Sequence, residues 1–429
     1  MRSSNARGTR RRSPIEAIRS RGADGRSRAG AHGARGSAGV VRTRHVDLPG
    51  PLALDSGRVL PEVRIAYETY GTLAPSRDNV ILVCHALSGD AHAAGRSDDP
   101  EAPSAVDGVG ADEQGRARGG LGWWDGMIGP GKAFDTDRYF VVSSNLIGSC
   151  RGSTGPGSPD PATGCPYGAT FPVVTVGDMV RAERAFLEIL GITRLLAVSG
   201  GSLGGMQALE WAVAYPDTVE AIVPIASTAR LGTQGVAWNA IARNAITSDP
   251  DWQAGAYLGT GRAPTVGIQI ARMVGHMTYL SEQAVSEKFG RRFQDGAGPS
   301  YDLVAADYAV ESYLRYQADV FARRFDPNAY LYLSRALSHF DLARSYGGGS
   351  LERALAPVRA ATLLLSFSSD WLYPPRDSEE VARALRANGR DATHTVIDAS
   401  YGHDSFLLEE ARMTGEITAF LDRVAAPVA

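Results

Sequence analysis

Short apolar runs of strand length alternate with amphipathic segments along most of the chain. Strands are predicted at residues 64–71, 79–84, 138–145, 195–199, 219–226, 362–367 and 393–398. Most of these runs are rich in Val, Ile and Leu, which is typical of strands buried on both faces of a parallel sheet. Helices are predicted between them at residues 178–190 and 206–214. The alternation predicts an α/β fold built on a mostly parallel, doubly wound sheet.

The strand rhythm is absent between residues 228 and 350. Apolar positions there recur at helical spacing in residues 268–278, 281–289, 304–321 and 328–336. A helical insertion between two core strands is the arrangement expected of a lid over an active site. We therefore predict a core in two parts, residues 41–229 and 351–429, separated by a helical lid over residues 230–350.

The first forty residues have a different composition from the rest. They hold ten arginines and two acidic residues, with Ser, Gly and Ala and few large apolar side chains. Such a segment cannot bury enough apolar surface to order itself, so residues 1–40 are predicted to be a disordered, dispensable extension. An organelle transit peptide, a start codon placed too far upstream and a tail that touches nucleic acid weakly are the alternatives.

The formal net charge of the chain is -3, so the folded part is not expected to bind nucleic acid or an anionic membrane. Its three cysteines form neither an even disulfide framework nor a CxxC pair, which fits a reducing compartment, and we expect a cytoplasmic protein. No apolar run of about 20 residues occurs, so no segment is expected to span a membrane.

A serine stands on a glycine-rich turn between a predicted strand and a predicted helix. Gly200-Gly201-Ser202-Leu203-Gly204 follows the strand at 195–199 and precedes the helix at 206–214. This order is typical of a nucleophile elbow, whose small residues let the turn tighten until the hydroxyl stands clear of the sheet. The helix N-terminus also favours developing negative charge. Ser202 is therefore the candidate nucleophile.

An acid and a histidine follow later strands in the order that such a nucleophile requires. Asp370 comes after the strand at 362–367, and His403 comes after the strand at 393–398. Open parallel sheets carry their reactive groups beyond the carboxyl ends of the strands. One such Asp or His alone is usually a cap or turn residue, but the three side chains together indicate a catalytic triad.

Backbone amides close to the nucleophile are expected to form an oxyanion hole. One donor is the amide of Leu203, which directly follows the serine. The second is expected in the loop after the strand at 79–84, around Ala86 and Leu87, and we select Leu87.

Two histidines in that loop, His85 and His92, raise the question of a metal site. The pair lacks the spacing of a helical metal motif, and no third ligand follows at a recognisable interval. We therefore predict structural histidines and no metal.

Beyond the triad, the chain resembles the homoserine O-acetyltransferase family, the acyl-CoA-dependent branch of the α/β-hydrolase superfamily. The resemblance extends from about residue 45 to the C-terminus. It rests on residues 84–92 (CHALSGDAH), 122–125 (GWWD), 152–156 (GSTGP), 200–207 (GGSLGGMQ), 311–314 (ESYL) and 402–404 (GHD). The doubled glycine, Met and Gln after the serine distinguish these enzymes from generic esterases. The fold that the resemblance implies is the α/β-hydrolase fold.

The resemblance implies transfer of an acetyl group from acetyl-CoA to the hydroxyl of L-homoserine, in methionine biosynthesis. Ser202 would carry the acyl group, His403 would act as base and acid, and Asp370 would orient the imidazole. Arg243 would pair with the carboxylate of homoserine, and Asp404 would bind its ammonium group. Acetyl-CoA is then a co-substrate, no cofactor is bound permanently, and a homodimer formed through the helical insertion is expected.

Two positions bear on the acyl donor. Arg151 is a cation near the expected mouth of the site, suited either to CoA phosphates or to a succinyl carboxylate. Succinyl-using relatives often carry Arg directly after the Asp-Trp pair, whereas Asp370-Trp371 is followed here by Leu372. Desolvating an unpaired succinyl carboxylate costs several kcal/mol, so acetyl is the expected acyl group. The alternatives are an O-succinyltransferase acting on homoserine or serine and, more remotely, a serine esterase.

Overall fold

The computed structural model describes residues 36–98, 120–294 and 298–425. The predicted N-terminal extension therefore lies outside the described residues, apart from positions 36–40. Within the described ranges no helix has both the length and the apolarity needed to cross a bilayer.

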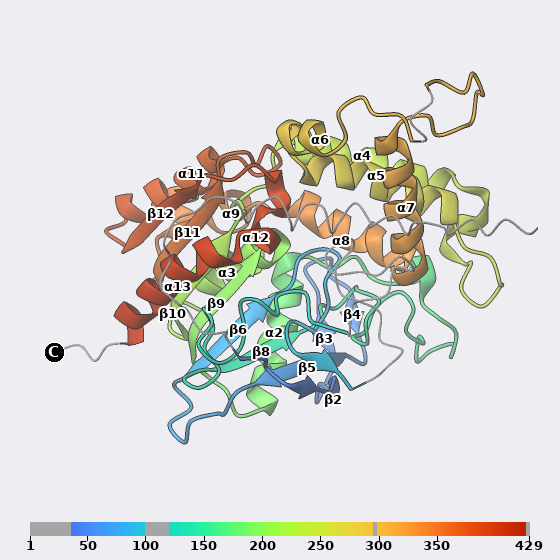
Figure 1. Cartoon of the computed structure of the whole chain (residues 1–429). Coiled ribbons are helices and arrows are strands. Elements are labelled where there is room, and N and C mark those ends of the chain that lie inside the picture. Colours follow the sequence, from blue (N-terminus) through green and yellow to red (C-terminus); the bar gives the residue numbers. More distant parts are fainter. Residues whose placement is uncertain (1–35, 99–119, 295–297, 426–429) are drawn as a thin grey trace, which may run out of the picture.

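An eight-stranded sheet forms the centre of the molecule (Figure 1). Its strands lie in the spatial order β12-β11-β10-β9-β6-β8-β5-β2. In chain order they are β2 (Arg44–Asp47), β5 (Arg64–Tyr70), β6 (Val80–Cys84), β8 (Phe140–Ser144), β9 (Leu195–Gly201), β10 (Val219–Ile225), β11 (Ala361–Phe367) and β12 (Ala392–Ile397). The pairs β2–β5 and β5–β8 are antiparallel and the other pairs are parallel. The predicted mostly parallel sheet is confirmed.

Short elements complete the part of the chain that the structure describes. Strand β1 (Val40–Val41) pairs with β7 (Arg96–Ser97), and β3 (Leu52–Ala53) pairs with β4 (Val59–Leu60). Three 3-10 turns are η1 (Gly168–Thr170), η2 (Pro250–Gly255) and η3 (Gly402–Asp404).

Helices pack on both faces of the sheet because its central strands are apolar on both faces. On β6, Val80 and Leu82 belong to one buried cluster, whereas Ile81 and Val83 belong to the other. The first cluster is covered by α2 (Val176–Ile189), α3 (Leu203–Ala214) and α11 (Pro375–Ala387), and the second by α13 (Glu410–Ala425). Helix α12 (Ser405–Leu408) precedes α13. The sheet is therefore doubly wound, as expected.

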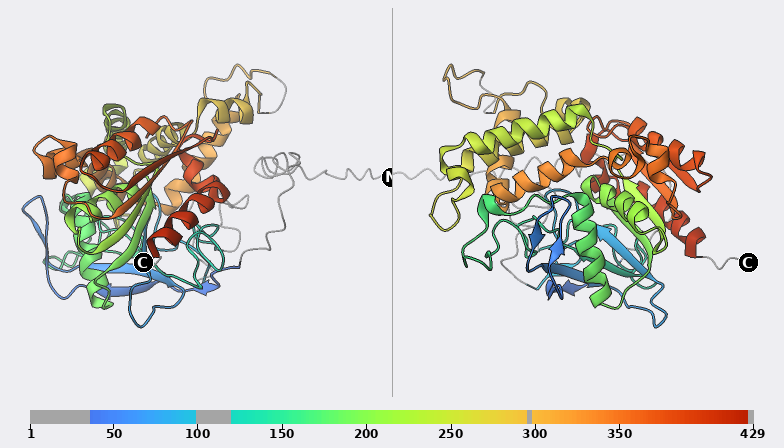
Figure 2. Two further views of the ribbon diagram at one scale, coloured as in Figure 1. Left: turned by 90° about the vertical axis from the view of Figure 1, so that its left-hand side faces the viewer. Right: turned by 180° about the vertical axis from the view of Figure 1, so that it is seen from behind.

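Seven helices lie between β10 and β11 in the described part of the chain. They are α4 (Thr233–Ser248), α5 (Thr265–Tyr279), α6 (Glu282–Phe289), α7 (Ala309–Arg324), α8 (Pro327–His339), α9 (Leu342–Gly347) and α10 (Leu351–Leu355). Helices α4 to α8 gather on one side of the sheet (Figures 1 and 2). Helix α7 begins five residues later than its predicted start at 304. The domain limits at 41, 230 and 351 stay a prediction.

Candidate active site

Ser202 lies at the turn from β9 into α3, with φ 57° and ψ −118°. A positive φ is costly for a residue with a side chain, so the surrounding contacts must hold this conformation. The Ser202 amide donates to the Ile225 carbonyl at 2.9 Å, and the Ser227 hydroxyl donates to the Ser202 carbonyl at 2.8 Å. These bonds fix the main chain on both sides of the serine hydroxyl.

The glycines beside Ser202 let this turn pack directly on β6. A Cβ atom at Gly200 or Gly204 would lie 2.4 Å or 2.1 Å from the Cys84 carbonyl oxygen. No side chain fits at either position without displacing the neighbouring strand. The spacing of glycines that marks the elbow in the sequence thus reflects main-chain contact with β6.

His403 and Asp370 form a buried hydrogen-bonded pair. His403 Nδ1 donates to Asp370 Oδ2 at 2.8 Å, and the two residues are 3% and 2% exposed. The other carboxylate oxygen of Asp370 accepts the amides of Leu372 and Tyr373 at 3.0 and 2.9 Å. These three bonds orient the carboxylate and leave Nε2 of His403 as the proton acceptor.

Tyr373 connects this pair to the serine. Its ring centroid lies 5.0 Å from that of His403, and its phenol lies within electrostatic range of the Ser202 side chain. Burial raises the pKa of Tyr373, so the phenol stays protonated. Tyr373 was not among the residues predicted from the sequence, although its position three residues after Asp370, in the same loop, was an available signal.

The two predicted oxyanion donors lie close to Ser202. Leu203 is the first residue of α3, and the first amides of a helix have no partner within their own helix. Leu87 lines the same cavity as Ser202. Their role as oxyanion donors stays a prediction.

His85 shapes the loop that carries Leu87. Its Nδ1 donates to the Ala86 carbonyl at 2.7 Å, and its Nε2 accepts the Leu146 amide at 3.2 Å. The residue is fully buried, and this burial lowers the pKa of His85. The imidazole is therefore neutral and structural. Among the residues with described positions, no three His, Cys, Asp or Glu side chains gather in a manner that suits a metal ion.

A cavity roofed by the helical insertion opens above Ser202. Its walls include Trp238 of α4, Tyr279 of α5, Tyr330 of α8 and Leu372. The insertion also touches the histidine loop, because a Cβ at Gly402 would lie 2.5 Å from the Ser281 amide nitrogen. The core carries Ser202, Asp370 and His403, and the insertion supplies much of the cavity wall.

The two predicted homoserine-binding residues lie outside the wall of this cavity. Arg243 donates from Nη1 to the Ser334 carbonyl and the Ser338 hydroxyl, each at 3.1 Å. Burial, and then nearby Arg335, lower the pKa of Arg243. Its neighbour one turn earlier, Asn239, does line the cavity.

Asp404 directly follows His403 and is half-buried at the start of α12. Lys288 of α6 lies within electrostatic range of Asp404. Burial lowers the pKa of Lys288 to about 8, and the carboxylate of Asp404 opposes that shift.

Comparison with known proteins places this site in a family. The family model described as alpha/beta hydrolase fold matches residues 79–410. The homoserine O-acetyltransferase of Solidesulfovibrio magneticus is 50% identical over 373 residues, which cover 87% of this chain and 89% of the relative. The chain belongs to the homoserine O-acetyltransferase family.

Other members extend the likeness to structure and to a second acyl group. The crystal structure of homoserine O-acetyltransferase from Bacillus anthracis superposes with a TM-score of 0.79 at 30% identity, covering 89% of this chain and 98% of that one. The homoserine O-succinyltransferase of Bordetella pertussis is 48% identical over 396 residues, covering 91% of this chain and 90% of the relative. The relatives therefore share the transfer of an acyl group to homoserine, but they differ in whether that group is acetyl or succinyl.

Proposed function

We propose that this chain transfers the acetyl group of acetyl-CoA to the γ-hydroxyl of L-homoserine, releasing CoA and O-acetyl-L-homoserine for methionine biosynthesis. The observation that carries the proposal is the buried Asp370–His403 pair beside Ser202 on a strained elbow. No permanently bound cofactor is needed, because the acyl group arrives on CoA. With Cys84, Cys150 and Cys165 unbridged, a cytoplasmic location suits the enzyme.

In the first half-reaction, the Ser202 hydroxyl attacks the thioester carbonyl while His403 Nε2 takes its proton. The resulting oxyanion accepts hydrogen bonds from the amides of Leu203 and Leu87. The carbon–sulfur bond then breaks, and His403 returns the proton to the departing thiolate. CoA leaves, and an acetyl ester remains on Ser202.

In the second half-reaction, His403 removes the proton of the homoserine hydroxyl as its oxygen attacks the acetyl ester. Collapse of the intermediate transfers the acetyl group and returns the proton to Ser202. The proposed partners of the amino acid are Arg243, one turn after the cavity residue Asn239, and Asp404, directly after His403, because a zwitterion needs a fixed cation for its carboxylate and a fixed anion for its ammonium group. Serine, one methylene shorter, would place its hydroxyl farther from the ester carbon.

The donor preference rests on Leu372, which lines the cavity with Ser202. An apolar side chain there offers no partner for the distal carboxylate of a succinyl group. Replacing Leu372 by Arg is expected to raise kcat/KM for succinyl-CoA relative to acetyl-CoA by about tenfold or more. Steady-state rates with both donors measure this ratio. Leu372→Met is the control, because Met is also apolar and the ratio is expected to stay low. If the ratio of kcat/KM for succinyl-CoA to that for acetyl-CoA were unchanged in Leu372→Arg, Leu372 would not determine the preference for the acetyl donor.

The activity is tested by incubating the purified chain with acetyl-CoA or succinyl-CoA, each with homoserine, serine or water alone. The proposal expects rapid CoA release only with acetyl-CoA and homoserine, and O-acetylhomoserine as the product. Acyl release that is equally fast without an amino acid would instead identify an esterase.

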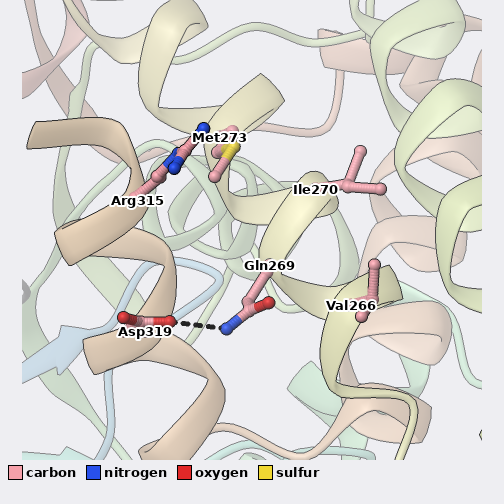
Figure 3. A pocket seen from close by; sticks show the side chains of 6 residues that line it. All are labelled: Val266, Gln269, Ile270, Met273, Arg315 and Asp319. Atoms are coloured by element: carbon pink, nitrogen blue, oxygen red, sulfur yellow. Dashed lines mark hydrogen bonds between the residues drawn. The ribbon is translucent and has the colours of Figure 1, made fainter. Parts of the chain in front are cut away.

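We also propose that the enzyme is a homodimer formed through the helical insertion. Val266, Ile270 and Met277 of α5 are 62%, 43% and 40% exposed, at spacings that place them on one helix face. Figure 3 shows Val266 and Ile270 beside a hollow between α5 and α7. Exposed apolar side chains that share one helix face are typical of a protein interface.

Replacing Ile270 by Glu is expected to convert the dimer to a monomer, because burying a charge in place of an apolar side chain at the interface is costly. Light scattering at micromolar concentration measures the mass. Ile189→Glu on α2, a helix that packs on the sheet outside the insertion, is the matched control, since Ile189 is similarly exposed at 42%. A wild-type monomer, or a dimer that survives Ile270→Glu, would contradict the proposal.

A further inference from the structure

We propose that three buried side chains of the core, Gln207, His85 and Ser227, are positioning residues that aim the two oxyanion donors. Each acts through the main chain rather than by contact with the substrate. The inference rests on the proposed function, because oxyanion donors matter only if an acyl group is transferred through the serine. One donor belongs to α3, and the other belongs to the oxyanion loop, residues 85–95, which joins β6 to β7.

The side chain of Gln207 joins α3 to the oxyanion loop. It is one of the residues that carry the family resemblance, and the triad gives it no role. Its Nε2 donates to the Leu203 carbonyl at 3.1 Å and to the His85 carbonyl at 3.3 Å. One amide group therefore ties the residue that carries the first donor to the loop that carries the second.

The oxygen of the same amide has no partner. Gln207 Oε1 is buried and accepts no hydrogen bond from the described residues. Rotating the amide would only bring Oε1 against the two carbonyl oxygens. A buried acceptor without a donor is costly, and an apolar side chain of similar shape would avoid that cost. Stability alone therefore does not explain glutamine at this position, whereas a need for two N–H groups at one point does.

His85 determines the direction of the Leu87 amide through the peptide bond between Ala86 and Leu87. The Ala86 carbonyl accepts His85 Nδ1 at 2.7 Å and the Gly89 amide at 3.0 Å. In a planar trans peptide the N–H points opposite to the C=O, so holding this carbonyl also holds the Leu87 N–H. Within the described ranges this N–H donates to no other residue, and Leu87 lines the cavity that contains Ser202.

Ser227 determines the direction of the Leu203 amide in the same manner. The Ser202 carbonyl accepts the Ser227 hydroxyl at 2.8 Å. The amides of Gly205 and Met206 donate to the same carbonyl at 3.0 and 3.2 Å. The Leu203 N–H shares a peptide plane with this carbonyl and points away from these three donors. Both oxyanion donors are thus directed by bonds to the carbonyl of their own peptide.

The test replaces Gln207 by Met, which keeps the shape and removes both N–H groups. Rapid mixing with p-nitrophenyl acetate measures the acylation of Ser202 in the first turnover. The maximal acylation rate is expected to fall by about 10-fold to 100-fold, because a donor displaced by about 1 Å no longer meets the oxyanion. The half-saturating ester concentration should change little, since the oxyanion forms only after binding. The melting temperature is expected to stay close to that of the wild type, because the unsatisfied Oε1 is removed as well.

Methylboronic acid provides a readout that a merely structural role would not move. The Ser202 hydroxyl adds to boron and its proton passes to His403, which leaves a tetrahedral anion with an oxygen at the oxyanion position. The dissociation constant of this adduct is expected to rise in proportion to the fall in acylation rate. The dissociation constant of CoA, which forms no oxyanion, should stay unchanged.

The other two positions are tested in the same assays. Ser227→Ala and His85→Phe are expected to slow acylation and weaken the boronate adduct. His85→Asn, whose amide can still donate to the Ala86 carbonyl, is expected to recover part of the loss. The matched controls are Gln317→Met, at a buried glutamine of α7, and Ser199→Ala, at a buried serine that donates to a main-chain carbonyl. Both controls should acylate at the wild-type rate.

Two results would overturn the inference. The first is an unchanged acylation rate in Gln207→Met and Ser227→Ala. The second is slower acylation with unchanged affinity for methylboronic acid, which would assign these side chains a structural role. If Gln207→Met failed to fold, Gln207→Asn would carry the same expectations, because its amide is one methylene too short to reach both carbonyls. A wild-type chain that is acylated by the ester but transfers nothing to homoserine would contradict the proposed function alone.

Discussion

Replacing Ser202 by alanine is expected to lower kcat for acetyl transfer by about 10⁴-fold or more, because the reaction then has no atom on which to carry the acyl group. The substitution is expected to lower the rate of acetyl transfer without disturbing the fold. Alanine occupies nearly the same space and keeps the main-chain bonds to Ile225 and Ser227. CoA release in the presence of homoserine measures the effect.

Ser199→Ala is the matched control, since Ser199 is buried on the same strand and its hydroxyl donates only to the Val223 carbonyl at 3.1 Å. It is expected to keep nearly full activity. Activity in Ser202→Ala comparable to that of the control would refute the nucleophile assignment and with it the acyl-enzyme.

The second large effect is expected from Asp370→Asn, which should lower kcat by about 10⁴-fold while leaving the fold intact. An asparagine amide can donate to Nδ1 of His403, which then carries its proton on Nε2 and no longer accepts one from Ser202. The amides of Leu372 and Tyr373 still find an acceptor in the asparagine oxygen. Both half-reactions should slow, because His403 is the base in each.

Asp398→Asn is the control for this substitution. Asp398 lies near the same histidine loop, but its carboxylate accepts the Ser368 hydroxyl at 2.8 Å. Thermal unfolding of both variants separates a catalytic loss from instability. If Asp370→Asn retained most of its activity, the hydrogen bond to His403 would have no catalytic role.

Much of the core could be predicted because its central strands, such as β6 and β9, are buried on both faces and therefore read as apolar runs. Seven of the eight sheet strands were expected, and the predicted triad residues lie in the loops after β9, β11 and β12. The exception, β2, is an antiparallel edge strand whose sequence, Arg44–Asp47, is mostly polar. With four residues and one apolar side chain, β2 is too short and too polar for the pattern to mark it.

The insertion and the outer parts of the site could not be predicted in this way. Helix α4 was not expected, because Gly235 and few buried side chains leave it without a clear apolar stripe. The contacts of Arg243 with α8 and of Arg324 with the oxyanion loop join segments 91 and 236 residues apart. Such contacts depend on how the helices pack against each other and against the core, and the hydrophobic pattern within one segment does not reveal this packing. Tyr373 likewise gains its role only from the fold of the loop around Asp370.

The most direct test of catalysis through Ser202 is to detect the acyl group on the protein. The chain is incubated with acetyl-CoA without an acceptor, quenched in acid, digested and mapped by mass spectrometry. We predict one acetyl group on the peptide that contains Ser202, which disappears when homoserine is added before the quench and never forms in Ser202→Ala. An acetyl group on another residue, or turnover with no acetylated peptide even when the quench is fast, would contradict a Ser202 acyl-enzyme.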